Sequence, residues 1–162
     1  MGVQIMFDQA NSFYICSKLC KRELNENSGS NDLFAIPRIV NLTFACEVYL
    51  KTLLASSKTN VEKKHRLNDL YDALPDEDRF FIETYMETRY PLRDVFGSRF
   101  IDVEADDFVA WRYIYEKDTL SCDIGYLEAL AETLQELCCM RIYELSWKRY
   151  CKTANINSDL WG

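Results

Sequence analysis

Residues 37–57 read PRIVNLTFACEVYLKTLLASS, and this stretch decides the fold class. Apolar side chains recur along it at intervals of three and four, the period of one face of an α-helix. Pro37 fits the first turn of that helix, where its missing N–H would have no partner in any case. We therefore predict a buried helix from residue 37 to about residue 57. Its buried face is expected to comprise Ile39, Leu42, Cys46, Tyr49, Leu50 and Leu53.

Helical patterns flank this stretch on both sides. The first covers about residues 4–25, with an expected buried stripe of Met6, Ala10, Phe13, Cys20 and Leu24. A short helix is expected after residue 66, with an apolar face of Leu67, Leu70, Tyr71 and Leu74. Pro75 ends it and begins the next helix, whose acidic first turn suits the positive end of the helix dipole. The side chains expected to be buried from that helix are Phe81, Tyr85 and Met86.

The last helical pattern is the longest, at about residues 123–152. Its expected stripe is Leu127, Leu130, Leu134, Leu137, Cys138, Arg141 and Leu145. About 30 residues of helix would span about 45 Å, which is longer than a small domain is wide. The length therefore predicts that part of this helix packs against a second subunit. Residues 91–119 show poor periodicity, and a segment of that length within a compact domain is often functional.

Composition agrees with a single all-α domain over residues 1–162, with a core at 5–150 and a tail at 151–162. Five glycines and three prolines are too few for an all-β fold, which needs more turn residues. Seven cysteines, an odd number without a secretory signal, indicate free thiols and a cytoplasmic location. No apolar stretch approaches about 18 residues, so we expect no transmembrane helix and no membrane partner.

Charge is unevenly distributed along the chain. The net charge of −7 excludes nucleic-acid binding through bulk charge. Residues 58–66 nevertheless carry four basic side chains against Glu62, a local net charge of +3. These four are Lys58, Lys63, Lys64 and Arg66. The loop is either a phosphate or RNA contact or an ordinary solvated loop, and the sequence leaves both interpretations open.

Catalytic motifs are scarce. The chain has one histidine, His65, and lacks phosphate-binding glycine loops and the GxSxG nucleophile motif. Lys64 and Arg66 beside His65 would disfavour the imidazolium that a general base must become. The acidic clusters at 76–78 and 106–107 are interpreted as dipole matching and solvation. We expect no metal site and no cofactor.

Arg112 lies between Trp111 and Tyr113, so its guanidinium is expected to be partly buried. A buried guanidinium needs an acidic partner, and Glu47, inside the apolar stripe of residues 37–57, is the candidate. The pair Glu47–Arg112 would then be a structural ion pair. The alternative is that Arg112 is positioned to bind phosphate. Glu47 and Lys51 also have the i, i+4 spacing of an ion pair on the helix of residues 37–57, in the more favourable orientation.

Three segments together resemble one protein family. They are FACEVYLKTLL at 44–54, KHRLNDLYDAL at 64–74 and FVAWRY at 108–113. In order and spacing they are similar to the HEPN domain, in which an E-x-x-LK-x-LL helix precedes an H-x-L-x-x-L-x-x-x-L helix and an aromatic-Arg-Tyr element. The resemblance covers about residues 5–150 and implies a bundle of four to five helices, frequently a homodimer, with a long C-terminal helix.

The resemblance also carries functional expectations. Many HEPN proteins are RNases of toxin–antitoxin or antiphage systems that use Arg-x(4–6)-His. Arg112 matches that arginine, but the positions four to six residues later begin with Glu116 and hold no histidine. His65 matches another histidine of the pattern, which caps or orients the short helix.

Two functions follow. The first is a non-catalytic HEPN-like binding protein, homodimeric, that binds a partner protein, a nucleotide or RNA. Its phosphate contacts would be Lys58, Lys63, Lys64, Arg66 and Arg112. By family analogy, a nucleotidyltransferase is a candidate partner. The alternative is a metal-independent endoribonuclease that uses Arg112 with Glu116 or His65.

Overall fold

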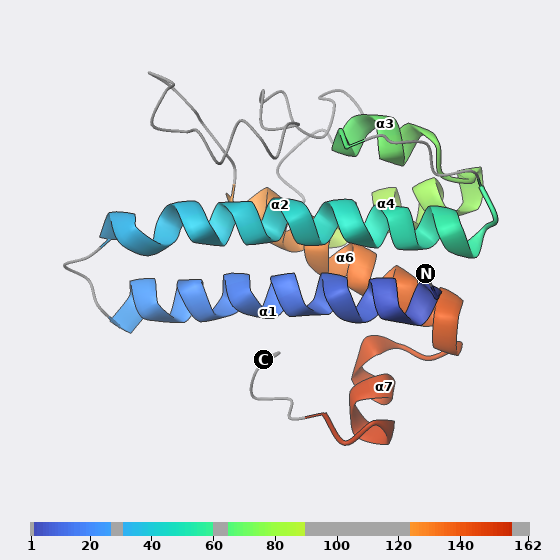
Figure 1. Cartoon of the computed structure of the whole chain (residues 1–162). Helices are drawn as coiled ribbons and strands as arrows, with labels where there is room; N and C mark the ends of the chain where they lie inside the picture. Colours follow the sequence, from blue (N-terminus) through green and yellow to red (C-terminus); the bar gives the residue numbers. More distant parts are fainter. Residues whose placement is uncertain (1, 27–30, 60–64, 90–123, 157–162) are drawn as a thin grey trace.

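The computed structural model describes residues 2–26, 31–59, 65–89 and 124–156 of the chain. These ranges contain helices and turns and no strand, which confirms the all-α class. The helices are α1 (Val3–Glu26), α2 (Asn31–Ser56), α3 (Leu67–Asp72), α4 (Asp76–Arg89), α6 (Ile124–Tyr143) and α7 (Trp147–Thr153) (Figure 1).

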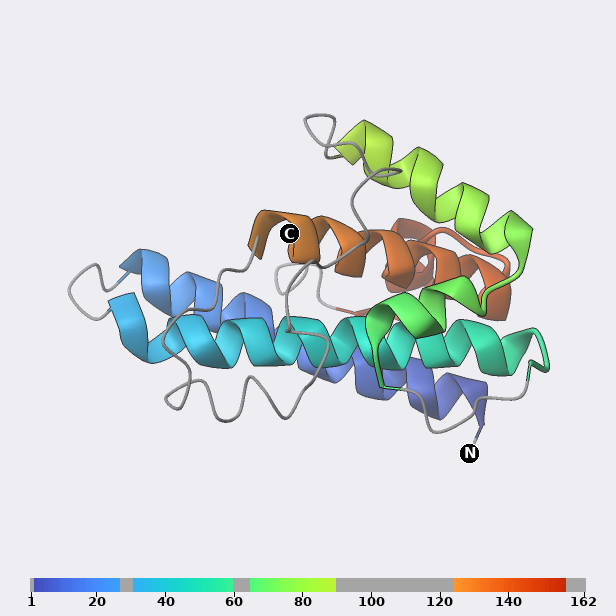
Figure 2. The same cartoon turned by 90° about the horizontal axis from the view of Figure 1, so that it is seen from above.

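Helix α2 is the centre of the bundle. It runs antiparallel to α1 along its length, and α6 packs against both helices. Helix α3 lies on α2, whereas α4 packs on α6 (Figures 1 and 2). The predicted stripe of α2 is confirmed, because all six of its side chains are buried. By length and hydropathy Phe34–Ser56 could cross a membrane, but 67% of its apolar window is buried inside the bundle. Such burial is typical of a core helix.

The start of α2 differs from the prediction. The helix begins at Asn31, so Pro37 lies inside it instead of in its first turn. Pro37 is therefore past the first turn, where a proline removes one i→i−4 hydrogen bond, and the packing of α2 against α1 supports the helix through that local cost. The Asn41 side chain also donates a hydrogen bond to the Pro37 carbonyl at 2.7 Å.

The predicted buried stripe of α1 was right at Ala10 and wrong by one position at Met6 and Phe13, while the Leu24 side chain lies outside the described residues. Phe7 and Tyr14 are fully buried and Ala10 is buried as expected, whereas Met6 and Phe13 are only partly buried and Cys20 is partly exposed. The reason is tertiary. The Phe7 ring lies 6.0 Å from Tyr49 of α2 and 6.0 Å from Trp147 of α7, so it completes an aromatic cluster from three helices.

Helix α3 follows the prediction, while α4 follows it only in part. Leu67, Leu70 and Leu74 are buried, and the Pro75 carbonyl accepts the first backbone bonds of α4. The buried face of α4 is Asp78, Ile82 and Met86. The predicted Phe81 and Tyr85 are instead partly exposed and stack on each other at 4.3 Å, because α6 packs against the neighbouring stripe.

The predicted long last helix is broken. Helix α6 ends at Tyr143, Glu144 adopts φ 56°, and α7 starts at Trp147, with Ser146 as its N-cap. The Ser146 Oγ accepts from the Arg149 N–H at 3.4 Å, as N-cap residues do. The turn lets Trp147 reach Phe7, which a straight helix could not. The span of about 45 Å that predicted a second subunit is therefore absent.

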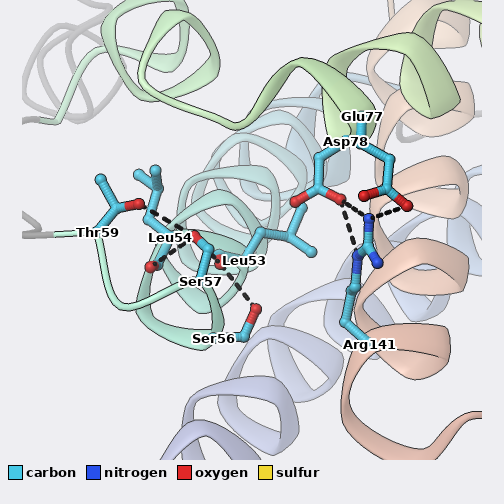
Figure 3. A network of polar contacts seen from close by, with 8 residues as sticks. All are labelled: Leu53, Leu54, Ser56, Ser57, Thr59, Glu77, Asp78 and Arg141. Carbon is cyan, nitrogen blue, oxygen red and sulfur yellow. Dashed lines mark hydrogen bonds and ion pairs between the residues drawn. The ribbon is translucent and has the colours of Figure 1, made fainter.

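Arg141 joins α6 to α4 instead of lying in the core. Its Nε donates to the buried Asp78 carboxylate at 2.8 Å, and a terminal nitrogen lies 3.2 Å from Glu77 (Figure 3). At the neighbouring end of α2, the Leu53 carbonyl accepts from the hydroxyls of Ser56 and Ser57. These bonds use polar groups that the end of a helix leaves without partners.

Candidate functional site

Glu47 is a carboxylate on the apolar face of α2, and only 5% of its side chain is exposed. A buried carboxylate is costly unless charged or hydrogen-bonding groups face it. Two do so: Lys51 Nζ lies 2.6 Å from Glu47 Oε1, and His65 Nδ1 lies 3.0 Å from the same oxygen. The expected partner, Arg112, lies outside the described residues, so the Glu47–Arg112 pair stays a prediction.

Two different elements deliver these partners. Lys51 follows Glu47 by one helical turn, the i, i+4 spacing at which side chains on a helix meet. His65 lies just before α3, and the buried side chains of Leu67 and Leu70 hold α3 against the bundle. The resemblance implied that this histidine caps or orients the short helix. The residue at the cap is Arg66, which makes no side-chain cap bond, and His65 instead bonds Glu47.

The hydrogen bonds favour one tautomer of His65. The Glu47 carboxylate accepts only and lies 3.0 Å from His65 Nδ1, closer than Lys51 Nζ at 3.4 Å, so the geometry favours a proton on Nδ1 that is donated to Glu47. A neutral His65 that donates from Nδ1 leaves Nε2 as an acceptor. The ring as a whole is well exposed, with 65% of the side chain accessible to solvent. Glu47 therefore fixes the ring by one edge and leaves the other edge free.

A surface pocket of about 340 Å³ adjoins this cluster. Helix α1 contributes Met6 and Gln9, and α2 contributes Phe44 and Val48, beside the three polar side chains. The Phe44 ring is held edge-on by Phe13 of α1, at 4.4 Å between centroids. The pocket thus combines an apolar, partly aromatic wall with a rim of polar side chains that can donate or accept protons. We call it the Glu47 pocket.

The predicted basic loop adjoins the pocket. Arg66 is the neighbour of His65 and is exposed, and Lys58, also exposed, follows the end of α2. Lys58 adopts φ 56°, in the left-handed region that commonly ends a helix. Lys63 and Lys64 lie outside the described residues, as do Arg112 and Glu116.

Some residues of the pocket were not predicted from sequence. Lys51 was recognised only as an ion-pair partner of Glu47, and Phe44 and Gln9 were not singled out. The Glu47–Lys51 spacing was a usable signal, because it puts both groups on one side of α2. Within the four described ranges, no three His, Cys, Asp or Glu side chains gather as metal ligands.

Comparison with models of known protein families, with curated proteins and with solved structures finds no match to this chain. Its function is therefore inferred from the geometry of the Glu47 pocket and from the residues around it.

Proposed function

We propose that the protein is a non-catalytic, HEPN-like binding protein that binds the phosphate of RNA or of a nucleotide at the Glu47 pocket. The observation that supports this most is the sharing of one buried carboxylate oxygen by Lys51 and His65 at the pocket rim. Both donors are held in place before a ligand arrives, so little side-chain entropy is lost on binding.

Local charge supports an anionic ligand. Glu47 balances Lys51, while Arg66 and Lys58 add positive charge at the same end of α2 in a chain of net charge −7. An anion would therefore be attracted to this end and repelled by most of the remaining surface.

The pocket wall supports a ligand that carries a ring as well as a phosphate. The volume of about 340 Å³ is at the lower end of the range for small-molecule sites. Phe44 offers an aromatic surface, and nucleobases bind such surfaces in a sequence-tolerant way. A nucleotide unit, free or within RNA, would place its base toward Phe44 and its phosphate toward Lys51 and Arg66.

A second candidate is the metal-independent RNase, and one observation favours it. A buried carboxylate that accepts from His65 Nδ1 and leaves Nε2 free is the arrangement that orients a histidine base. That reading needs a second group to stabilise the phosphorane, and Arg112 with Glu116 are the sequence candidates. We favour binding without cleavage because the Arg-x(4–6)-His pattern lacks its histidine here.

Phosphate binding is tested by a charge-reversal pair. The double variant Lys58→Glu/Arg66→Glu should bind fluorescently labelled single-stranded RNA about tenfold more weakly than the wild type, with a shallower salt dependence. The matched control is Lys148→Glu/Lys152→Glu, which makes the same charge change at exposed positions of α7. Fluorescence anisotropy at several salt concentrations measures both effects, and a labelled nucleotide serves as the second probe.

The control should stay within about twofold of the wild type, because α7 is not part of the pocket. Equal losses in both variants, or no binding by the wild type, would contradict the proposal. Gel analysis of the same RNA separates the two candidate functions. Intact RNA supports the non-catalytic protein, whereas cleavage that His65→Ala abolishes supports the RNase.

We also propose that the protein is a homodimer, with a second copy covering the groove between α4 and α6. This groove measures about 320 Å³ and carries two exposed apolar side chains, Phe80 at 70% and Met140 at 41%. Helix α4 begins with Asp76 and Glu77 and ends with Arg89. A twofold axis would pair α4 antiparallel with its copy and set Glu77 toward Arg89 of the partner subunit. Opposite charges would then flank a shared apolar centre.

By family analogy, a nucleotidyltransferase stays the candidate for a further protein partner.

The homodimer is tested by changing the exposed centre of the groove. Phe80→Glu should convert the dimer to a monomer, because the interface would bury an uncompensated charge. Light scattering coupled to gel filtration gives the mass. Ile5→Glu, which adds the same charge at another exposed apolar side chain, should leave the dimer intact. A monomeric wild type at high concentration would overturn the homodimer, and a dimeric Phe80→Glu would overturn only this choice of face.

A further inference from the structure

We propose that Nε2 of His65 is a phosphoryl acceptor, so that the Glu47 pocket is regulated by covalent phosphorylation of its own histidine. The regulatory effect rests on the phosphate binding proposed above, but the modification itself depends only on the geometry of Glu47, Lys51 and His65. The co-substrate class is a small or protein-bound phosphoryl donor with a good leaving group, such as an acyl phosphate or a phosphoramidate.

The first requirement is a nucleophilic nitrogen that is free and correctly oriented. Glu47 Oε1 lies 3.0 Å from His65 Nδ1, and a neutral ring that donates to it from Nδ1 carries its lone pair on Nε2. The carboxylate is 5% exposed and the imidazole is 65% exposed, so the fixed side of the pair is buried and the reactive side faces outward. An accessible nucleophile oriented by a buried third group is the arrangement found in activated nucleophiles generally.

The second requirement is compensation of charge during the transfer. As Nε2 attacks phosphorus, positive charge develops on the ring, and the Glu47 carboxylate beside Nδ1 stabilises it. The incoming phosphoryl oxygens carry negative charge, which Arg66, the next residue, and Lys51, whose Nζ lies 3.4 Å from Nδ1 of the same ring, can offset. Positioning and electrostatic stabilisation supply most of the catalysis in phosphoryl transfer.

Phosphoryl transfer to His65 is a nucleophilic substitution at phosphorus, and it involves no oxidation or reduction. The Nε2 lone pair forms the N–P bond while the bond from phosphorus to the leaving group breaks, and its electron pair departs with that group. With phosphoramidate the P–N bond breaks and ammonia leaves after taking a proton from solvent. The Nδ1 proton stays in its hydrogen bond to Glu47 throughout.

Lys51 is a poorer acceptor at the same site. Its ammonium has no lone pair while it donates to Glu47, and only 19% of the side chain is exposed. The chain contains no other histidine, so an acid-labile, alkali-stable phosphate that is absent from His65→Ala identifies His65. Phosphorylation would place two negative charges where the ligand phosphate binds, and we expect it to weaken RNA binding.

The experiment incubates the full chain with potassium phosphoramidate and follows the intact mass with time. We expect one phosphoryl group per chain, lost in acid, and none in His65→Ala. Glu47→Gln preserves the size of the side chain but removes its charge, and should slow phosphorylation at least about tenfold. The matched control is Glu87→Gln, an exposed carboxylate of α4, which should react like the wild type.

A comparison of the folded chain with the chain unfolded in urea tests the orientation directly. A histidine that is merely accessible would react at the same rate in both, whereas His65 oriented by Glu47 should react faster when folded. Equal rates, or a Glu47→Gln variant as fast as the wild type, would overturn the inference. Circular dichroism establishes that each variant is folded, and Glu47→Asp, which restores the carboxylate, should recover part of the rate.

RNA binding by the modified protein separates the two proposals. Phosphorylated protein that binds RNA about tenfold more weakly than unmodified protein supports both. Phosphorylation without any RNA or nucleotide binding overturns the proposed function and leaves the acceptor site standing. RNA binding with no phosphorylation of His65 overturns the acceptor site alone.

Discussion

Replacing Asn11 by alanine is expected to lower the free energy of unfolding by about 2–6 kcal/mol. The Asn11 Oδ1 atom accepts from the Tyr49 hydroxyl at 2.6 Å and from the Gln135 amide at 2.9 Å. All three residues are buried and come from α1, α2 and α6. Without Asn11, two buried donors lose their acceptor, and each unsatisfied group costs about 1–3 kcal/mol. Urea unfolding followed by circular dichroism measures the change.

A double-mutant cycle separates the hydrogen bond from the lost packing. Tyr49→Phe alone should cost about 1 kcal/mol, because one hydrogen bond is lost and the ring stays. In the Asn11→Ala background the same change should be neutral or stabilising, since it removes an unpaired hydroxyl. Strictly additive effects would show that Asn11 and Tyr49 do not depend on each other, and would contradict this network.

Raising the pH from 8 to 10 is expected to destabilise the protein by about 4 kcal/mol through Cys138 and Cys139 alone. Burial raises the pKa of the Cys138 thiol well above its ordinary value and raises the pKa of Cys139 to about 12. In the unfolded chain both thiols ionise near pH 8.5. Because the folded pKa is the higher one, this stability is fully present below about pH 8.5 and is lost as the pH rises toward 12.

The measurement is urea unfolding at pH 8 and pH 10 with a reducing agent. Cys138→Ala/Cys139→Ala should be less stable at pH 8, because of lost packing, but should lose much less stability between the two pH values. Cys16→Ala, which removes an exposed thiol, is the control and should keep the wild-type difference. Burial also raises the pKa of Tyr49, so a further loss is expected above pH 10. An unchanged pH dependence in the double cysteine variant would refute this assignment.

Local sequence patterns predicted the structure correctly where the residues of a segment favoured a single assignment. The stripe of α2 was correct because its apolar side chains repeat over several turns. The start of α4 was correct because Pro75 and the acidic residues after it both favour a helix start. The stripe of α1 was misassigned because Met6 and Phe7 are adjacent and both apolar, and helical periodicity alone does not distinguish which of the two is buried.

The candidate site was predicted in part. Glu47 stood out because a carboxylate on an apolar face needs a partner, and Lys51 followed from the helical spacing. His65 was connected only to the short helix before which it lies, because nothing in residues 65–74 reveals which helix they pack against. The Glu47–His65 contact joins residues 18 positions apart, and only the packing of α3 on α2 produces it.

The sequence by itself determined that this protein is helical, that its core helix includes residues 37–56 and that Glu47 requires compensation. Periodicity, helix-ending residues and the cost of burying charge are local properties, so they can be recognised along the chain. The tertiary structure alone decided the break at Glu144, the burial of Phe7 and the meeting of Glu47 with His65. Each depends on contacts between separate helices: aromatic packing outweighs the helix propensity of one residue, and a buried charge takes whichever partner the fold brings within reach.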